Sequence, residues 1–353
     1  MTVRVLVVDD SALMRQLLSE LLNEDPRIAV VGAAPDPYAA RERIKALNPD
    51  VLTLDIEMPR MDGLSFLEKL MALRPMPVVV VSTLTQKGAD AAVRALELGA
   101  VDCVAKPLID LRTGMTELRD ELVAKVLTAA ASRPAARNRT EVPRAPLHFD
   151  PHLSTAGWIV AIGASTGGVE ALQELLSAMP ANAPAILVTQ HMPPGFTTSF
   201  AHRLDQRCAM PVFEASNGQR VMPGHIYIAN GSQHLELVRS GAHFACRLHD
   251  GPPVSGHRPS VDVLFASVAV AAGRNAIGVI LTGMGQDGAA GLLEMRRAGA
   301  RTRGQDEGSC LIYGMPKAAK LAGGVEAERP LSKMAAEILA LTQERSAARV
   351  GAG

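Results

Sequence analysis

The sequence predicts an α/β protein of two domains, each built around a parallel or mostly parallel β-sheet. The chain has 353 residues, and at about 150 residues per domain this length suits two domains. Short apolar segments alternate with segments of helical periodicity, which is typical of parallel sheets covered by helices on both faces. A stretch rich in proline and arginine divides two such patterns and is expected to be a linker. The predicted domains are residues 1–125 and 156–347, with the linker at 126–155.

The first domain is predicted to be a doubly wound sheet of five parallel strands. The expected strands are Val3–Val8, Ile28–Val31, Val51–Ile56, Pro77–Val81 and Asp102–Ala105. The expected helices are Ala12–Leu22, Asp36–Leu47, Gly88–Leu98 and Thr116–Ala131. Ser11 directly precedes the first of these helices, and a serine hydroxyl is a preferred N-cap because it accepts a free backbone N–H.

The second domain is predicted to repeat this alternation with a larger, mostly parallel sheet. The expected strands are Trp158–Ile162, Ala185–Thr189 and Ala276–Leu281, with another inside Val221–Ala229 and a candidate hairpin before Leu248. The expected helices are Val169–Met179, Phe196–Leu204, Val261–Ala272, Gly288–Ala298 and Ser332–Arg345.

Composition argues against several classes of protein. Lys+Arg and Asp+Glu both number 36, and aromatic residues make up only 3%, which gives no support to nucleic-acid binding. No apolar run approaches the roughly 20 residues of a membrane-spanning helix, so no membrane insertion is expected. The four cysteines form no CxxC motif, and no signal peptide precedes the first strand. Reduced thiols and a cytoplasmic location are therefore expected.

Acidic side chains follow two predicted strands of the first domain. Asp9 and Asp10 follow the first strand, Asp55 ends the third, and Lys106 follows the fifth. Because parallel strands present their carboxyl ends at one edge, these groups are expected to share a crevice. Clustered carboxylates repel unless a cation joins them, and oxygen ligands suit Mg²⁺. A carboxylate beside Mg²⁺ and a lysine can accept a phosphoryl group, whereas Asp9 and Asp10 alone could simply cap the next helix.

The first domain resembles the receiver domain of two-component response regulators. The matching segments are Val7–Asp10, Leu54–Pro59, Met61–Gly63 and Lys106–Pro107. The resemblance implies that Asp55 accepts the phosphoryl group. It also implies that Asp10, Asp55 and the backbone carbonyl of Glu57 bind Mg²⁺, with Asp9 acting through a water molecule.

The same resemblance implies a switch hydroxyl at the end of the fourth strand. Ser82 is the expected switch residue, and Thr83 is the close alternative. Lys106 is expected to take part in the switch, and its bond to Pro107 is expected to be cis, which an X–Pro bond tolerates.

A glycine-rich turn in the second domain carries a candidate nucleophile. Gly163–Gly168 follows a strand, precedes a helix and matches the G-x-S-x-G pattern around Ser165. A helix N-terminus at this point favours negative charge. Two other interpretations compete: Ser165 could be only an N-cap, or the loop could cradle a phosphate. The loop lacks both the GxGxxG pattern and the Walker lysine of such phosphate sites.

A serine nucleophile needs a base, and the base needs an acid that fixes its tautomer. His191 follows the strand Ala185–Gln190 and is the best-placed base, with His257 the next best. Asp287 lies in the loop after the strand that ends at Leu281 and is the expected acid. Asp262 is the alternative acid, but it lies at a predicted helix start, where its negative charge would simply interact with the positive end of the helix dipole.

The whole chain resembles one family, the chemotaxis response regulators that act as protein-glutamate methylesterases and glutamine deamidases. The segments that carry the resemblance are Gly163–Gly168, Gln190–Phe196, Gly256–Asp262, Leu281–Gly288, Gln305–Glu307 and Gly314–Pro316. The resemblance implies that Ser165 is the nucleophile, His191 the base and Asp287 the orienting acid. It further implies an oxyanion hole formed by the backbone N–H groups of Met284 and Thr166.

The resemblance implies a hydrolase that removes methyl esters from receptor glutamates and deamidates receptor glutamines. Its expected partners are methyl-accepting chemoreceptors as substrates and a chemotaxis histidine kinase as phosphoryl donor. Mg²⁺ is expected only in the receiver domain, with no cofactor for the ester chemistry. Two alternatives stay open: a phosphorylation-controlled binding module without turnover, and a hydrolase of some other cytosolic ester.

Overall fold

The computed structural model describes residues 2–58, 62–106, 115–132, 147, 155 and 157–350. The chain divides into two compact units, Met1–Thr140 and Glu141–Gly353. Most of the predicted linker and the Lys106–Pro107 bond, expected to be cis, lie outside the described residues. No helix among the described residues is long and apolar enough to cross a membrane. All four cysteines are free thiols, and Cys103 and Cys246 are buried.

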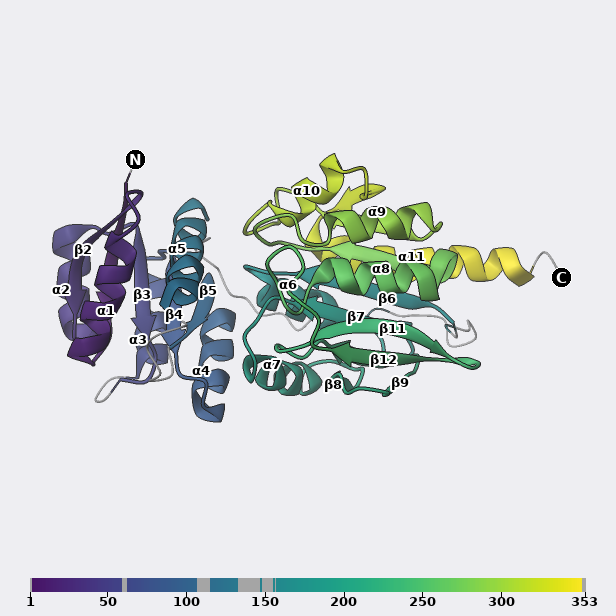
Figure 1. Cartoon of the computed structure of the whole chain (residues 1–353), viewed down its shortest axis with the longest axis horizontal. Coiled ribbons are helices and arrows are strands. Elements are labelled where there is room, and N and C mark those ends of the chain that lie inside the picture. The colour runs from purple at the N-terminus through teal and green to yellow at the C-terminus, as the bar shows by residue number, and fades with distance from the viewer. Residues whose placement is uncertain are drawn as a thin grey trace. The chain divides into compact units, whose positions relative to one another are not determined.

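The first unit is a five-stranded parallel sheet with strand order β2-β1-β3-β4-β5 (Figure 1). The strands are β1 Val3–Val8, β2 Ile28–Ala34, β3 Val51–Asp55, β4 Val78–Ser82 and β5 Asp102–Ala105. The helices are α1 Ala12–Asn23, α2 Pro37–Leu47, α3 Gly63–Leu73, α4 Gln86–Glu97 and α5 Met115–Ala131. From β1 the chain adds β2 on one side and then β3, β4 and β5 on the other side. Because the connections between parallel strands are right-handed, this change of direction places helices on both faces of the sheet. The predicted doubly wound sheet is confirmed.

The capping chemistry of this unit follows the sequence closely, with one omission. Ser11 and Asp36 cap α1 and α2 by accepting backbone N–H groups, as expected for these residue types. Helix α3 is absent from the predicted elements. Asp–Gly pairs are more typical of turns than of helix starts. In the structure Asp62 caps α3, and Gly63 begins it where a Cβ atom would lie 2.6 Å from the backbone oxygen of Asp55.

The second unit contains a seven-stranded parallel sheet with strand order β15-β14-β13-β6-β7-β10-β8. Its strands are β6 Ile159–Ala164, β7 Ala185–Gln190, β8 Val212–Glu214, β10 Ile226–Ile228, β13 Ala276–Ile280, β14 Arg301–Gln305 and β15 Ala327–Arg329. A small antiparallel sheet consists of β9 Arg220–Val221, β11 His234–Ser240 and β12 His243–His249. The mostly parallel domain and the hairpin are therefore confirmed.

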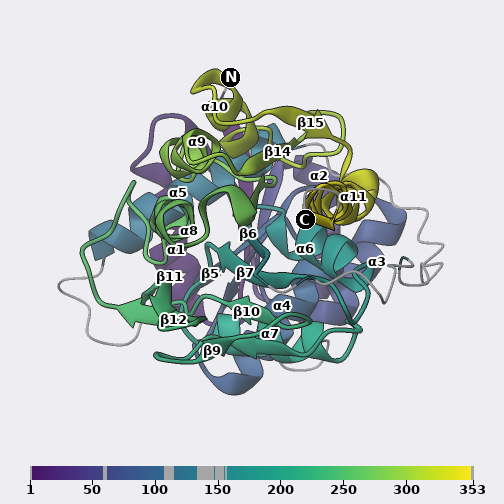
Figure 2. The same ribbon diagram turned by 90° about the vertical axis from the view of Figure 1, so that its right-hand side faces the viewer.

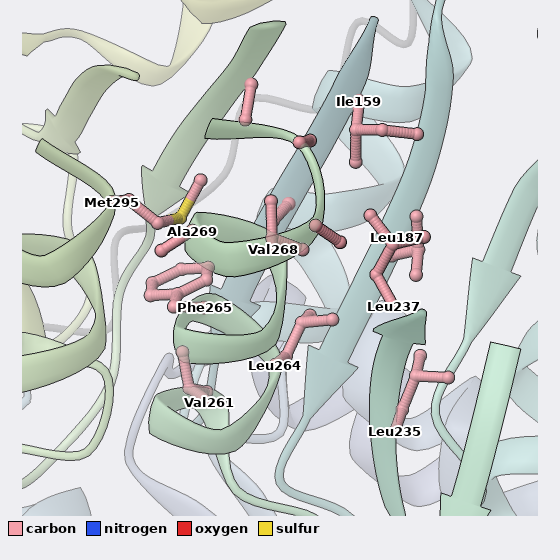
Figure 3. Close-up of a cluster of buried hydrophobic side chains, with 14 of the residues drawn as sticks. Ile159, Leu187, Leu235, Leu237, Val261, Leu264, Phe265, Val268, Ala269 and Met295 are labelled. Carbon is pink, nitrogen blue, oxygen red and sulfur yellow. The ribbon is translucent and has the colours of Figure 1, made fainter. Parts of the chain in front are cut away.

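The helices of the second unit cover its sheet (Figures 1 and 2). They are α6 Gly168–Ser177, α7 Phe196–Asp205, α8 Val261–Ala271, α9 Ala289–Arg297, α10 Met315–Leu321 and α11 Leu331–Val350, with a short 3-10 turn at Gly273–Asn275. Helix α8 packs against β6, β11 and α9. Figure 3 shows that Leu264 and Val268 of α8 lie near Leu187 and Leu237, so α8 joins the two sheets through one apolar core.

The core position of α8 gives a stability prediction. Phe265 is fully buried in this core, so Phe265→Ala should lower the free energy of unfolding of the second unit by about 3–5 kcal/mol. The measurement is urea denaturation followed by fluorescence of Trp158, the single tryptophan, which is buried in the same unit. Val270 of the same helix is 89% exposed, so Val270→Ala is the control and should change stability by less than about 0.5 kcal/mol. Equal losses in the two variants would contradict this account of the core.

Candidate active site and phosphoacceptor site

Three candidate catalytic residues lie on loops at the carboxyl ends of neighbouring strands. Ser165 follows β6, His191 follows β7, and Asp287 lies in the loop after β13. The strands are adjacent in the order β13-β6-β7. The parallel sheet therefore brings together residues that are up to 122 positions apart in the sequence, from Ser165 to Asp287.

The turn that carries Ser165 is fixed by backbone hydrogen bonds. The Ser165 N–H donates to the carbonyl of Thr282 at 3.0 Å, and the Gly168 N–H donates to the carbonyl of Ser165 at 2.7 Å. Gly167 has a φ of +77°, a conformation that favours glycine. Gly283 packs so closely that a Cβ atom there would lie 2.8 Å from the Cβ atom of Ser165. Ser165 is half-buried just before α6, at the positive end of the helix dipole.

His191 is paired with Asp287 through one ring nitrogen. The Nε2 atom of His191 lies 2.8 Å from Oδ2 of Asp287. The Nδ1 atom is buried and has no hydrogen-bond partner among the described residues. If the carboxylate holds the proton on Nε2, the Nδ1 lone pair is left to accept a proton. Nδ1 is therefore the basic atom of this pair.

The Asp287 carboxylate is held at the N-terminus of α8. Oδ1 accepts from the hydroxyl of Ser260 at 2.8 Å and from the N–H of Asp262 at 3.1 Å, and Oδ2 accepts from the N–H of Val261 at 2.7 Å. Burial raises the pKa of Asp287, but the hydrogen bonds from His191, Val261 and Asp262 outweigh it and bring this pKa down to about 2. Asp287 is thus a buried carboxylate that stays ionised.

The two rival residues have other contacts. Asp262 lies in the first turn of α8 and accepts the N–H of Gly291 at 2.8 Å, as expected for a negative charge at a helix start. The ring of His257 stacks on the ring of His191, with centroids 3.8 Å apart and planes inclined by 12°. His257 therefore contacts His191, the candidate base, whereas the ring nitrogen that contacts Asp287 belongs to His191.

The predicted oxyanion-hole residues lie around the Ser165 turn. Met284 follows Gly283, which packs on Ser165, and its side chain is 46% exposed. Thr166 is buried, and its carbonyl accepts the hydroxyl of Thr282 at 3.1 Å. The role of the Met284 and Thr166 N–H groups stays a prediction.

The acidic residues of the first unit converge as expected. Asp9, Asp10 and Asp55 each offer a carboxylate oxygen within 4.8 Å of the others, a set that suits a hard cation. Nζ of Lys106 lies 2.9 Å from Asp9 and 2.8 Å from Asp55. Burial raises the pKa of Asp55, and the hydrogen bond from Lys106 opposes this rise. The Asp9 carboxylate accepts the N–H of Ser11 at 2.8 Å, while Ser11 itself caps α1.

The two candidate switch hydroxyls have different partners. Ser82 is buried at the end of β4, and its hydroxyl donates to the carbonyl of Gly88 at 3.1 Å. The Thr83 hydroxyl donates to the carboxylate of Glu57 at 2.6 Å. The backbone N–H of Glu57 donates to Asp55 at 2.9 Å. Glu57 therefore links the end of β3 to Thr83 through its side chain, a contact that no sequence pattern indicated.

Comparison with known proteins assigns the family. Residues 160–338 match the family model of the CheB methylesterase, and residues 5–119 match that of the response regulator receiver domain. The chain belongs to the CheB methylesterase family. The protein-glutamate methylesterase/protein-glutamine glutaminases of Pectobacterium atrosepticum and Salmonella typhimurium are both 56% identical to it over 99% of either chain.

A solved structure agrees with this membership. The methylesterase catalytic domain of Thermotoga maritima CheB matches 53% of this chain and 99% of its own, with a TM-score of 0.52 and 37% identity. Two residues that sequence reasoning did not select, Ser260 and Gln190, also contact the catalytic candidates. Both lie inside segments that carry the family resemblance, but only the folded chain reveals their contacts.

The contacts of Asp287 give a testable prediction. In Asp287→Asn the amide would donate to Nε2 of His191 and place the ring proton on Nδ1, which could then accept none. Ester hydrolysis should fall by about 10³- to 10⁴-fold, measured as kcat of the phosphorylated full-length chain. The matched control is Asp262→Asn, which should lose less than about tenfold because Asp262 does not bond to the base. A larger loss in Asp262→Asn than in Asp287→Asn would contradict the assignment.

The lowered pKa of Asp287 also predicts a dependence of stability on pH. A depressed pKa stabilises the folded state above the unfolded value of about 4, and this contribution is lost as the pH falls towards 2. The difference in unfolding free energy between the wild type and Asp287→Asn should therefore shrink below about pH 4, as measured by urea denaturation. If the difference in unfolding free energy instead grows on acidification, the pKa of Asp287 is not lowered in the folded state.

Proposed function

We propose that the chain is a phosphorylation-activated protein-glutamate methylesterase and protein-glutamine glutaminase that acts on methyl-accepting chemoreceptors in the cytoplasm. The observation that carries the proposal is the His191–Asp287 pair, in which the N–H of His191 donates to the carbonyl of Ala164, directly before Ser165. Residues 156–347 form the catalytic domain, residues 1–125 the receiver domain, and residues 126–155 the linker between them.

Acylation begins at Ser165. Its Oγ attacks the γ-carbonyl carbon of a receptor glutamate methyl ester while Nδ1 of His191 takes the hydroxyl proton. Asp287 stabilises the imidazolium through Nε2. The negative oxygen of the tetrahedral intermediate accepts the N–H groups of Met284 and Thr166, each worth about 3 kcal/mol in comparable hydrolases. His191 then gives its proton to the departing methoxide oxygen, so methanol leaves and the acyl-enzyme remains.

Deacylation uses the same groups in the opposite order. His191 takes a proton from water, whose oxygen attacks the acyl carbon, and returns the proton to Oγ of Ser165 as the glutamate carboxylate departs. With glutamine as substrate, ammonia leaves in place of methanol and the product is again glutamate. The ester chemistry uses only side chains and N–H groups of this chain.

The receiver domain supplies the control. Asp55 accepts a phosphoryl group from a chemotaxis histidine kinase. Asp10, Asp55 and the Glu57 carbonyl would hold Mg²⁺, and Asp9 would assist through water. Mg²⁺ bound there would neutralise charge on the phosphoryl oxygens. Lys106, which already contacts Asp55, offsets further negative charge there. Ser82, or alternatively Thr83, then turns its hydroxyl towards the phosphoryl group and transmits the change.

The central test is methanol release from membranes that contain methylated receptors. Ser165→Ala should reduce the rate by more than about 10³-fold, because the nucleophile is lost. Wild-type release should rise about 5- to 150-fold when a phosphoryl donor is added, the usual range of allosteric coupling. Release from generic esters but not from receptors would point to another substrate. Absence of release from every form would favour a binding module.

The role of Asp55 has its own test. Asp55→Asn removes the acceptor oxygen and one negative charge beside Lys106, so the donor should no longer accelerate methanol release. Basal release without donor should stay within about threefold of the wild type, since Asp55 lies outside the ester site. The measurement is the ratio of rates with and without donor, with Asp50→Asn, on the surface of the same unit, as the control. Full stimulation of Asp55→Asn would contradict the acceptor assignment.

A further inference from the structure

The side chain of Gln190 connects the backbones of the two residues that exchange the catalytic proton. Gln190 is the last residue of β7 and is 3% exposed. Its Nε2 atom donates to the carbonyl of Ser165 at 2.9 Å and to the carbonyl of His191 at 3.1 Å. Since both partners are carbonyl oxygens, the NH₂ group and not the amide oxygen must face them.

This link continues the sheet where its backbone ladder stops. The N–H of His191 donates to the carbonyl of Ala164 at 3.1 Å, and in the described part of the chain this is the last backbone hydrogen bond between the ends of β6 and β7. Beyond it the chain turns into α6 on one side and into the loop before α7 on the other. The Gln190 amide supplies the next connection between the two segments, at the level of Ser165 and His191.

The oxygen of the Gln190 amide does not stabilise the fold. Oε1 of Gln190 is buried without a hydrogen-bond partner among the described residues. It faces Gly168, where a Cβ atom would lie only 2.0 Å from it. A buried oxygen without a partner destabilises a protein, and an apolar side chain of the same length would avoid that penalty. The amide is therefore better explained by what its NH₂ group holds than by packing.

We propose that Gln190 is a positioning residue that sets the distance between Oγ of Ser165 and Nδ1 of His191 by holding both backbones. The inference rests on the proposed roles of Ser165 and His191. A misplacement of about 1 Å can cost about 100-fold in rate. Because Gln190 is buried and is not expected to touch the substrate, its loss should lower kcat and leave KM unchanged.

The experiment compares Gln190→Met with the control Thr189→Val in the full-length chain. Thr189 is the neighbouring residue of β7, and its buried hydroxyl also has no partner among the described residues. Methanol release from methylated receptor membranes gives kcat and KM in the presence of phosphoryl donor, and labelling by a fluorophosphonate gives the reactivity of Ser165. Gln190→Met should lose about 10- to 100-fold in kcat and in labelling rate, with KM within twofold of wild type. Thr189→Val should match the wild type in kcat, in KM and in labelling rate.

A second variant separates positioning from stability. Gln190→Glu has nearly the shape of the wild type but no N–H in its ionised form, so it should lose as much kcat as Gln190→Met. Protonation restores one O–H donor, so the activity of Gln190→Glu relative to Gln190→Met should rise as the pH is lowered. A merely structural role would change Tm in these variants without this change in ratio.

The outcomes distinguish this inference from the function on which it rests. If Gln190→Met has the kcat of Thr189→Val while Ser165→Ala is inactive, the positioning role is wrong and the proposed function stands. If Gln190→Met lowers only Tm and retains kcat at a temperature well below Tm, the residue is structural and the inference is again overturned. If Ser165→Ala keeps its activity, the catalytic assignment itself fails, and the role of Gln190 fails with it.

Discussion

The buried, ionised carboxylate of Asp287 holds together three segments that are far apart in the sequence. It meets His191 on one side, and on the other it accepts the Ser260 hydroxyl and two backbone N–H groups at the start of α8. The same helix fills the space between the large sheet and the hairpin with Phe265 and its neighbours. The acid of the candidate triad is therefore positioned by the helix that completes the hydrophobic core, so packing and catalysis depend on one element.

The two units treat a buried carboxylate in different ways. Asp287 is surrounded by hydrogen-bond donors, and its pKa is depressed to about 2, so it stays ionised above that pH. Asp55 is buried beside Asp9, its pKa is raised by burial, and the ammonium group of Lys106 and the backbone N–H of Glu57 oppose this rise. A charge held by a rigid helix start is suited to orient a base. A carboxylate that a lysine ammonium group contacts directly is suited to accept a phosphoryl group, because the cation offsets the added negative charge.

The sequence was most informative where local chemistry decides the outcome. Apolar strands, N-caps such as Ser11 and Asp36, and the rule that sites form at the carboxyl ends of parallel strands placed Ser165, His191 and Asp287 at one edge. It was least informative where distant side chains meet. Helix α3 begins at an Asp–Gly pair, which is typical of a turn. The reason for glycine at this position is the close approach of the Asp55 backbone, and only the folded chain reveals it. The stacking of His257 and the use of Nε2 rather than Nδ1 towards Asp287 depend on rotamers that tertiary packing sets.

Polar atoms left without partners mark the two sites within the part of the chain that the structure describes. Six buried side-chain atoms there have no hydrogen bond, and four of them belong to Asp9, Asp55, Gln190 and His191. The oxygens of Asp9 and Asp55 lie within ion-pair distance of Lys106, whereas Nδ1 of His191 and Oε1 of Gln190 have no such compensation. Such atoms destabilise a fold, and they persist where chemistry requires them. In the proposed mechanism Nδ1 takes a proton, and Oε1 of Gln190 is unpaired while the NH₂ group of the same amide donates to the carbonyls of Ser165 and His191. In the proposed mechanism, the cost of one unpaired oxygen at Gln190 follows from holding the candidate nucleophile at a set distance from the candidate base.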